Sequence, residues 1–158
     1  MKYKVFYMLP SSWMFVVAGL TGSFLMVLFF SFVPFFIGKH YKVVRILGTM
    51  LTGQSYVHHG LSKSKRATFA GLLVHYTTGC IFAALYYYLW KNGIGSPTLE
   101  CTIFFGLING LLAYVAWQLL FYIHPHPPHI YLLEYLFLFF IAHMIFAINV
   151  WVVYQIFN

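Results

Sequence analysis

Four long apolar runs, separated by short polar segments, dominate the pattern of this chain. They cover about residues 13–37, 67–90, 101–123 and 130–156. A helix rises 1.5 Å per residue, so a run of about 20 apolar residues is long enough to cross the ~30 Å hydrocarbon core of a bilayer. Each of the four runs is therefore predicted to be a transmembrane helix.

The polar stretch from Lys39 to Arg66 contains a shorter amphipathic segment, at about residues 43–56. Its apolar side chains recur at roughly helical spacing, namely Val43, Val44, Ile46, Leu47, Met50 and Leu51. The segment is too short to cross a bilayer, and its pattern is typical of a helix lying on the membrane surface. We predict an all-α integral membrane protein. It is a four-helix transmembrane bundle of one domain, residues 1–158, with one interfacial helix between spans 1 and 2.

Composition supports the membrane assignment. Of 158 residues, 62% are hydrophobic and 7% are charged, whereas about a quarter of the residues in an ordinary globular protein are charged. The net charge of +7 comes from residues outside the apolar runs. Such a balance suits an anionic lipid surface, and without a basic face on a polar domain we expect no nucleic-acid partner.

The second span places one histidine among small residues. Every fourth position carries one of these residues, in the order Gly71, His75, Gly79 and Ala83. Residues at this spacing share one face of a helix, and small residues let helix backbones approach closely in lipid. We therefore expect His75 to face protein, and the other helices to pack around this span.

The third span carries a second small-residue motif, the G-x-x-x-G formed by Gly106 and Gly110. Such motifs mark faces where helices pack closely. The glycine faces could serve contacts within the chain, or contacts to a second copy in a homo-oligomer or to a larger membrane complex.

The number of spans determines which loops share a membrane face. With four spans, the segment from Lys39 to Arg66 and the turn from His124 to His129 lie on the same side. That side collects six of the eight histidines, namely His40, His58, His59, His124, His126 and His129. It also holds six Lys or Arg residues against three on the other side. The positive-inside rule thus places it in the cytoplasm and both termini outside, where Trp13, Trp90 and Trp151 mark the opposite interface.

Ionisable residues inside the spans are the first candidates for function, because they are costly in lipid. Counted from the histidine-rich face, His75 lies roughly 13 Å deep, and Gln118 and Glu134 lie roughly 6–8 Å deep. These three residues could meet in one shallow polar pocket. Alternatively, Glu134 lies at the interface and meets water or basic side chains.

Histidines also suggest two cofactor hypotheses. A b-type haem between His75 and His143 needs both at one depth, but we expect them about 7 Å apart. His143 is also half a turn out of phase with Glu134, so its simplest role is a hydrogen bond across a helix interface. A surface metal site is the second hypothesis, because imidazoles suit zinc, copper or nickel. Its candidate ligands are His58, His59, His124, His126 and His129.

Catalytic constellations are missing from the sequence. The chain has no aspartate, and its two glutamates, Glu100 and Glu134, are expected near opposite faces. No G-x-S-x-G or H-E-x-x-H motif occurs. Cys80 and Cys101 form no C-x-x-C pair, so we interpret them as small apolar side chains. We name no catalytic residue.

The run Gly71-Leu-Leu-Val-His75, followed by Gly79, Phe82 and Tyr86, resembles the second helix of YagU-like membrane proteins. The layout over roughly residues 15–90 is also similar, with a glycine-containing first span and a Leu47-Gly48 step in the interfacial segment. The resemblance implies a four-span protein of the bacterial inner membrane. It implies no particular activity, ligand or catalytic residue.

Three functional hypotheses follow. The first is a non-enzymatic accessory or packing subunit. The second is a membrane protein that binds a metal ion or haem through histidines. The third is a carrier of protons or a small solute that uses His75 and Glu134.

Overall fold

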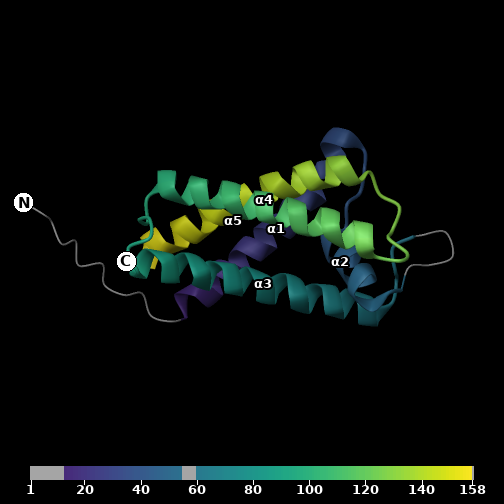
Figure 1. Ribbon diagram of the computed structural model, residues 1–158, viewed down its shortest axis with the longest axis horizontal. Helices are drawn as coiled ribbons and strands as arrows, with labels where there is room; N and C mark the ends of the chain where they lie inside the picture. Colours follow the sequence, from purple (N-terminus) through teal and green to yellow (C-terminus); the bar gives the residue numbers. More distant parts are fainter. Residues whose placement is uncertain (1–12, 55–59, 158) are drawn as a thin grey trace, which may run out of the picture.

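The computed structural model describes residues 13–54 and 60–157, and these form five helices (Figure 1). The helices are α1 (Met14–Ile37), α2 (Val43–Thr52), α3 (Lys65–Lys91), α4 (Leu99–Ile123) and α5 (Leu132–Phe157). Four of these helices are long and apolar enough to cross a membrane, and α2 is the short helix between the first two. The predicted fold class, a four-helix transmembrane bundle with one extra short helix, is confirmed.

Local chemistry explains where the helices begin and end. The predicted segment 43–56 stops at Thr52, because Gly53 takes a left-handed conformation (φ 63°) that closes the helix. The helix α3 starts at Lys65, two residues before the predicted position. Ser64 caps it there, since its hydroxyl accepts a hydrogen bond from the Ala67 N–H at 3.0 Å.

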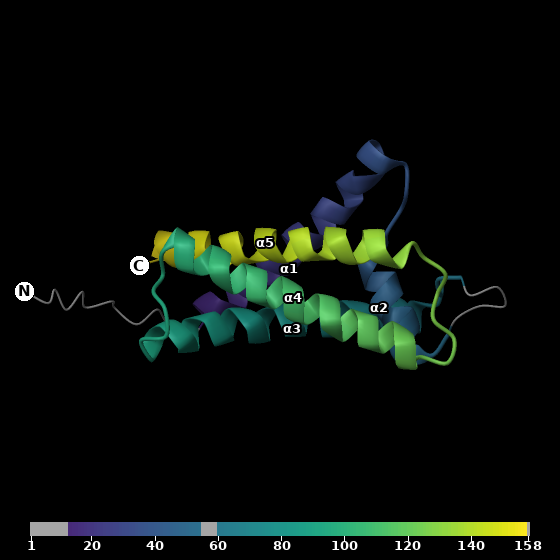
Figure 2. The same ribbon diagram turned by 45° about the horizontal axis from the view of Figure 1, so that its top comes forward.

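The packing order of the helices differs from the predicted one. The helix α1 packs against α3 and α5, α4 packs against α5, and α3 and α4 scarcely touch (Figures 1 and 2). The prediction that the other helices gather around α3 is therefore wrong. The small-residue stripe of α3 packs against α1 and α2, on one side of the helix only. The rest of α3 exposes apolar side chains such as Phe69, Leu73 and Ile81.

Glycines allow two close backbone approaches to α3. A Cβ on Gly71 would overlap the carbonyl oxygen of Val44 in α2, and a Cβ on Gly79 would overlap the hydroxyl of Ser23 in α1. The glycines of α4, Gly106 and Gly110, lie against side chains of α5 instead. All four predicted packing glycines thus contact helices of the same chain, which leaves none of these positions open to a second copy.

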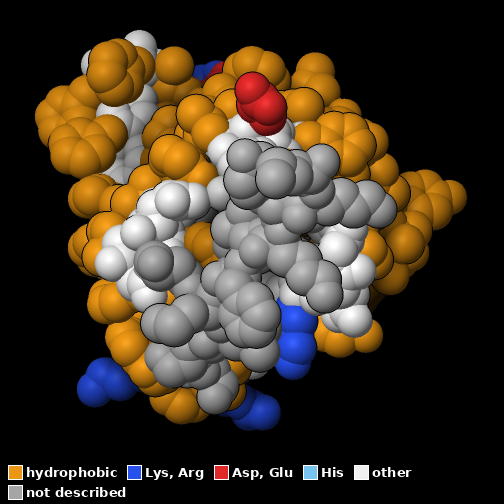
Figure 3. Space-filling model, turned by 90° about the vertical axis from the view of Figure 1, so that its left-hand side faces the viewer, with side chains coloured by type: hydrophobic (Ala, Val, Ile, Leu, Met, Phe, Trp, Pro, Cys, Tyr) orange, Lys and Arg blue, Asp and Glu red, His pale blue; other side chains and the backbone are white. Residues whose placement is uncertain are grey.

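The outer surface of the bundle is apolar. Each of the four long helices exposes large hydrophobic side chains, for example Phe24 in α1, Leu73 in α3, Leu111 in α4 and Phe137 in α5. Viewed from the end where α1 begins and α5 ends, hydrophobic atoms flank the bundle on its sides (Figure 3). A continuous apolar surface of this size needs a lipid environment. The chain is an integral membrane protein.

The two ends of the bundle carry different loops. The α2 helix and the connection from α4 to α5 lie at one end, and the α3–α4 loop lies at the other end, together with the start of α1 and the end of α5 (Figure 1). The ring of His124 bonds through Nε2 to the Met50 carbonyl at 3.1 Å, which ties the connection to α2. His40, His126 and His129 belong to the same end, whereas His58 and His59 lie outside the described residues.

Candidate functional site

A cavity of about 280 Å³ lies between α3 and α4. These helices are joined near their connecting loop, where Tyr86 stacks on Phe105 and its hydroxyl accepts a hydrogen bond from Asn109 at 3.0 Å. Farther from that loop they separate, and α1 and α5 form the floor of the gap. The rim includes Val74 and Leu112, which are exposed on the outer surface. The cavity therefore opens towards the lipid.

Two buried histidines, His75 of α3 and His143 of α5, line this cavity together. Counted from the helix starts in the structure, the expected 7 Å difference in depth falls to about 1.5 Å, one residue of helix. His75 lies ten residues after the first residue of α3, and His143 lies eleven residues after the first residue of α5. At 1.5 Å per residue, both are about 15–17 Å along their helices.

Each imidazole binds a backbone carbonyl through one nitrogen. Nε2 of His75 donates to the Ser23 carbonyl of α1 at 3.1 Å. Nδ1 of His143 donates to the Phe139 carbonyl at 2.8 Å, one turn back on its own helix and not across an interface as predicted. A carbonyl only accepts, so the bonded nitrogen carries the proton in a neutral ring.

The second nitrogen of each ring is consequently an unprotonated acceptor. Within the described residues, neither Nδ1 of His75 nor Nε2 of His143 has a hydrogen-bond partner. The buried hydroxyl of Ser23, which also lines the cavity, has no partner among the described residues either. Buried polar groups are normally paired, so these three groups would gain from a polar atom inside the cavity.

The remaining walls are mostly apolar and aromatic. Trp117 of α4 meets Phe139 of α5 edge to face at 5.7 Å between ring centroids, and Phe139 meets the His143 ring at 4.6 Å. Phe146 and the thioether-bearing Met26 also line the cavity. An apolar cavity with a few convergent polar groups is the usual form of a small-molecule site.

The predicted pocket of His75, Gln118 and Glu134 does not form. The carboxylate of Glu134 accepts hydrogen bonds from Lys39 and from the Tyr41 hydroxyl, the latter at 2.8 Å. The exposed Gln118 donates to Tyr114, four residues earlier on α4, at 3.1 Å. Neither residue lines the cavity of His75. Glu134 instead meets a basic residue near the membrane surface, which is the second of the two interpretations.

The carrier hypothesis loses its proposed pair for the same reason. It required His75 and Glu134 to exchange protons, and their side chains have separate partners. The segment after α1 explains the difference. Gly38 takes a left-handed conformation (φ 67°) that ends α1, and the chain then turns to bring Lys39 and Tyr41 onto the start of α5.

The surface histidines do not assemble a metal site in the described part of the chain. Both nitrogens of His124 are engaged, since Nε2 binds the Met50 carbonyl and Nδ1 accepts from the His126 N–H at 3.2 Å. Residues 13–54 and 60–157 contain no group of three or more His, Cys, Asp or Glu that could hold a metal ion. His58 and His59 lie outside those ranges.

A b-type haem fits the cavity poorly. Pockets for drug-sized ligands usually measure about 300–1,000 Å³, and a haem is larger than most such ligands, whereas this cavity measures about 280 Å³. The Nε2 atom of His75 is also already bound to Ser23. We therefore assign no haem chemistry to the pair.

Sequence reasoning found His75 but not its surroundings. The role of Ser23 was hidden because it reads as one more small packing residue after Gly19 and Gly22 of α1. His143 was set aside for two reasons: its helix was placed two residues too early, and it is half a turn out of phase with Glu134. Nothing in the sequence distinguished Trp117 from the other apolar residues of its span as a cavity residue.

A scan against protein-family models and searches of curated proteins and of solved structures found no match to this chain. The resemblance to YagU-like proteins thus rests on the short motif and the layout alone. Any function must be argued from the cavity.

Proposed function

We propose that this membrane protein binds a small, largely apolar molecule that carries a hydrogen-bond donor, such as a hydroxyl group. The binding site is the cleft between α3 and α4. One observation supports this most strongly: the acceptor nitrogens of His75 and His143 belong to one apolar cavity that opens towards lipid. We see a binding or accessory subunit in this arrangement, not an enzyme.

The walls indicate which molecules suit the cleft. Trp117 and Phe139 provide aromatic faces, and exposed Val74 and Leu112 at the rim would admit a molecule already dissolved in the bilayer. Aromatic rings favour stacked or edge-to-face partners. A phenol or a reduced quinone, with an aromatic ring and a hydroxyl donor, combines these properties.

The histidines define the polarity of the ligand. A charged side chain inside the bilayer is costly, so we take both rings as neutral. Each then offers a lone pair and no N–H to the cavity. A ligand hydroxyl can donate to such a nitrogen, whereas a ketone or an ether cannot. Each such bond contributes about 0.5–1.5 kcal/mol.

Two ligands of nearly equal shape test this proposal. Full-length protein in lipid nanodiscs is titrated with 4-hexylphenol and with 4-hexylanisole, its methyl ether, by isothermal calorimetry. We expect the phenol to bind more tightly. The single phenol proton can be accepted by one of the two rings, so His75→Ala or His143→Ala, whichever removes that acceptor, should weaken phenol binding about 2- to 12-fold. The exposed His129 serves as control through His129→Ala. Equal binding of phenol and ether, or unchanged binding in both variants, would reject the proposal.

A second candidate ligand is monovalent copper. Histidines that bind metal usually donate their other ring nitrogen to a carbonyl or carboxylate, as both rings do here. The thioether of Met26 lines the same cavity, and thioethers select Cu(I). A single positive charge also costs less to bury than a double one.

One variant distinguishes the phenol-type ligand from Cu(I). Met26→Leu keeps the volume and removes the sulfur, so it should weaken Cu(I) binding, measured by competition with a chromophoric chelator. It should leave 4-hexylphenol binding unchanged. A purified sample that takes up no Cu(I) from the chelator eliminates the copper candidate and leaves the phenol-type ligand.

We further propose that the α2 end faces the cytoplasm of a bacterial cell and that the protein lies in the inner membrane. The excess of Lys and Arg at this end supports the orientation, and the resemblance to YagU-like proteins supports the membrane.

A further inference from the structure

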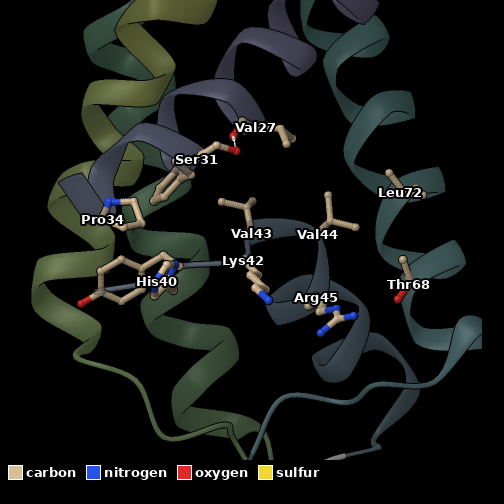
Figure 4. Close-up of a pocket in the computed structure, with 12 residues that line it drawn as sticks. Val27, Ser31, Pro34, His40, Lys42, Val43, Val44, Arg45, Thr68 and Leu72 are labelled. Carbon is tan, nitrogen blue, oxygen red and sulfur yellow. Dashed lines mark hydrogen bonds between the residues drawn. The ribbon is translucent and has the colours of Figure 1, made fainter. Parts of the chain in front are cut away.

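A second cavity, of about 410 Å³, lies at the α2 end of the bundle. There the last turns of α1 diverge from the rest of the molecule (Figure 2), and the space between α1, α2 and α3 remains open (Figure 4). Neither His75 nor His143 lines this cavity, whereas Val43 lines both this cavity and the cleft between α3 and α4.

The walls of this cavity divide into an apolar part and a basic part. Val27 and Phe30 of α1 and Leu72 of α3 line the apolar part. His40, Lys42 and Arg45 line the basic part, in the segment before α2 and in its first turn. In Figure 4 the side chains of Val43 and Val44 point towards α1, while those of Lys42 and Arg45 extend away from it.

The chain offers no carboxylate to these basic groups. It contains nine Lys and Arg residues but only two acidic ones. Glu134 is paired with Lys39, and Glu100 lies in the first turn of α4 at the other end of the bundle. Among the described residues, no side chain caps the N-terminus of α2, and its first turn contains no acid. The balancing negative charge must come from outside the chain.

We propose that this cavity binds an anionic phospholipid. Its phosphate would lie against Lys42 and Arg45, and one acyl chain would follow Val27, Phe30 and Leu72 between α1 and α3. The arginine fork matches the oxygen geometry of a phosphate, and basic pockets between transmembrane helices are known to hold anionic head groups. The cavity lies where α1 ends and α3 begins, which is the level of the head groups.

This inference is independent of the ligand proposed for the cleft. It assigns to α2 a role beyond packing, since Lys42 and Arg45 occupy its N-terminal turn while its other side contacts α3. A lipid in the cavity would fill the space between the divergent end of α1 and the rest of the bundle.

Lipid titration of the full-length protein tests the inference. The protein in detergent micelles is mixed with dioleoylphosphatidylglycerol or with dioleoylphosphatidylcholine, and bound lipid is counted by native mass spectrometry. We expect selective retention of the anionic lipid. Lys42→Gln and Arg45→Gln should each weaken this retention about fivefold. Lys63→Gln removes the same charge at the same end but outside the cavity, so it should have no such effect.

Each alternative result overturns the inference. Equal retention of both lipids in wild-type protein would show that charge does not select the occupant, and this comparison holds even if a variant fails to fold. An equal loss in Lys63→Gln would show a general charge effect. Displacement of the lipid by inorganic phosphate at equal concentration would show a site for a soluble anion instead.

Discussion

At the scale of single residues, the cluster around Glu134 shows how one carboxylate is stabilised at a membrane surface. Lys39 donates to it, and the same ammonium lies 3.7 Å from the centre of the Tyr131 ring. Tyr41 donates to the other carboxylate oxygen. These contacts of Lys39 and Tyr41 connect the segment after α1 to the start of α5. The cluster therefore fixes how these two elements pack.

Tyr41 gives this cluster a testable dependence on pH. Burial and then the hydrogen bond to Glu134 raise the pKa of its phenol above the usual value. A raised pKa means that the stabilisation is fully present below about pH 10, the pKa of an unfolded tyrosine, and is lost as the pH rises towards the higher folded value. Tyr41→Phe should therefore lower the melting temperature at pH 7, and the difference from wild type should narrow above about pH 10. A constant difference at all pH values would refute this account.

The residue scale also shows what the sequence could reveal. His75 was correctly expected to face protein, because its position among Gly71, Gly79 and Ala83 identifies the packed side of the helix. The partner of Glu134 was not predictable. It depends on the left-handed turn at Gly38, and this turn brings a lysine from 95 residues away in sequence.

At the scale of helices, the contact between α2 and α3 depends on two facing glycines. A Cβ on Gly48 would overlap the Ala67 carbonyl oxygen, and a Cβ on Gly71 would overlap the Val44 carbonyl oxygen. Backbone atoms cannot rotate away, so the helices themselves would have to separate. An added methyl group can then act only by disturbing the whole interface.

We predict that Gly48→Ala and Gly71→Ala each destabilise the protein by about 1–3 kcal/mol, the usual cost of overpacking. Thermal unfolding in detergent would measure the loss. Gly60→Ala is the matched control, because nothing lies within 4 Å of a Cβ placed there and its φ is not positive. Similar melting temperatures for all three variants would mean that α2 does not pack on α3 as described.

The hydrophobic pattern predicts the spans but not how they pair. In a soluble protein the polar face of a helix identifies its outer side, whereas in lipid the outer and inner faces are both apolar. Leu73 on the outside of α3 and Leu136 in the core are chemically identical in sequence. Only the small-residue stripes carry information on packing. They did not predict that α3 and α4 separate.

At the scale of the whole molecule, this separation creates the proposed binding site. The helices α3 and α4 are neighbours in sequence, yet α1 and α5 lie between them in the packing order. Their contact is confined to the end next to the loop, around Tyr86 and Asn109. The cleft is thus a consequence of the order of packing, and it could not be inferred from any single span.

The crossing of α4 makes a prediction about the orientation of the protein in a membrane. Ile94 lies in the α3–α4 loop and His129 in the α4–α5 connection, at opposite ends of the bundle (Figure 1). Both are exposed. In a background where Cys80 and Cys101 are replaced by alanine, Ile94→Cys and His129→Cys provide single thiols for a membrane-impermeant maleimide.

If the α2 end faces the cytoplasm, intact bacterial cells should label the thiol at position 94, and only permeabilised cells should label the thiol at position 129. The reverse pattern would keep the bundle but invert its orientation, and would move the proposed lipid site to the outer leaflet. Labelling of both thiols from one side would contradict the arrangement itself, because α4 joins the two loops and has to cross the membrane for them to lie on opposite sides.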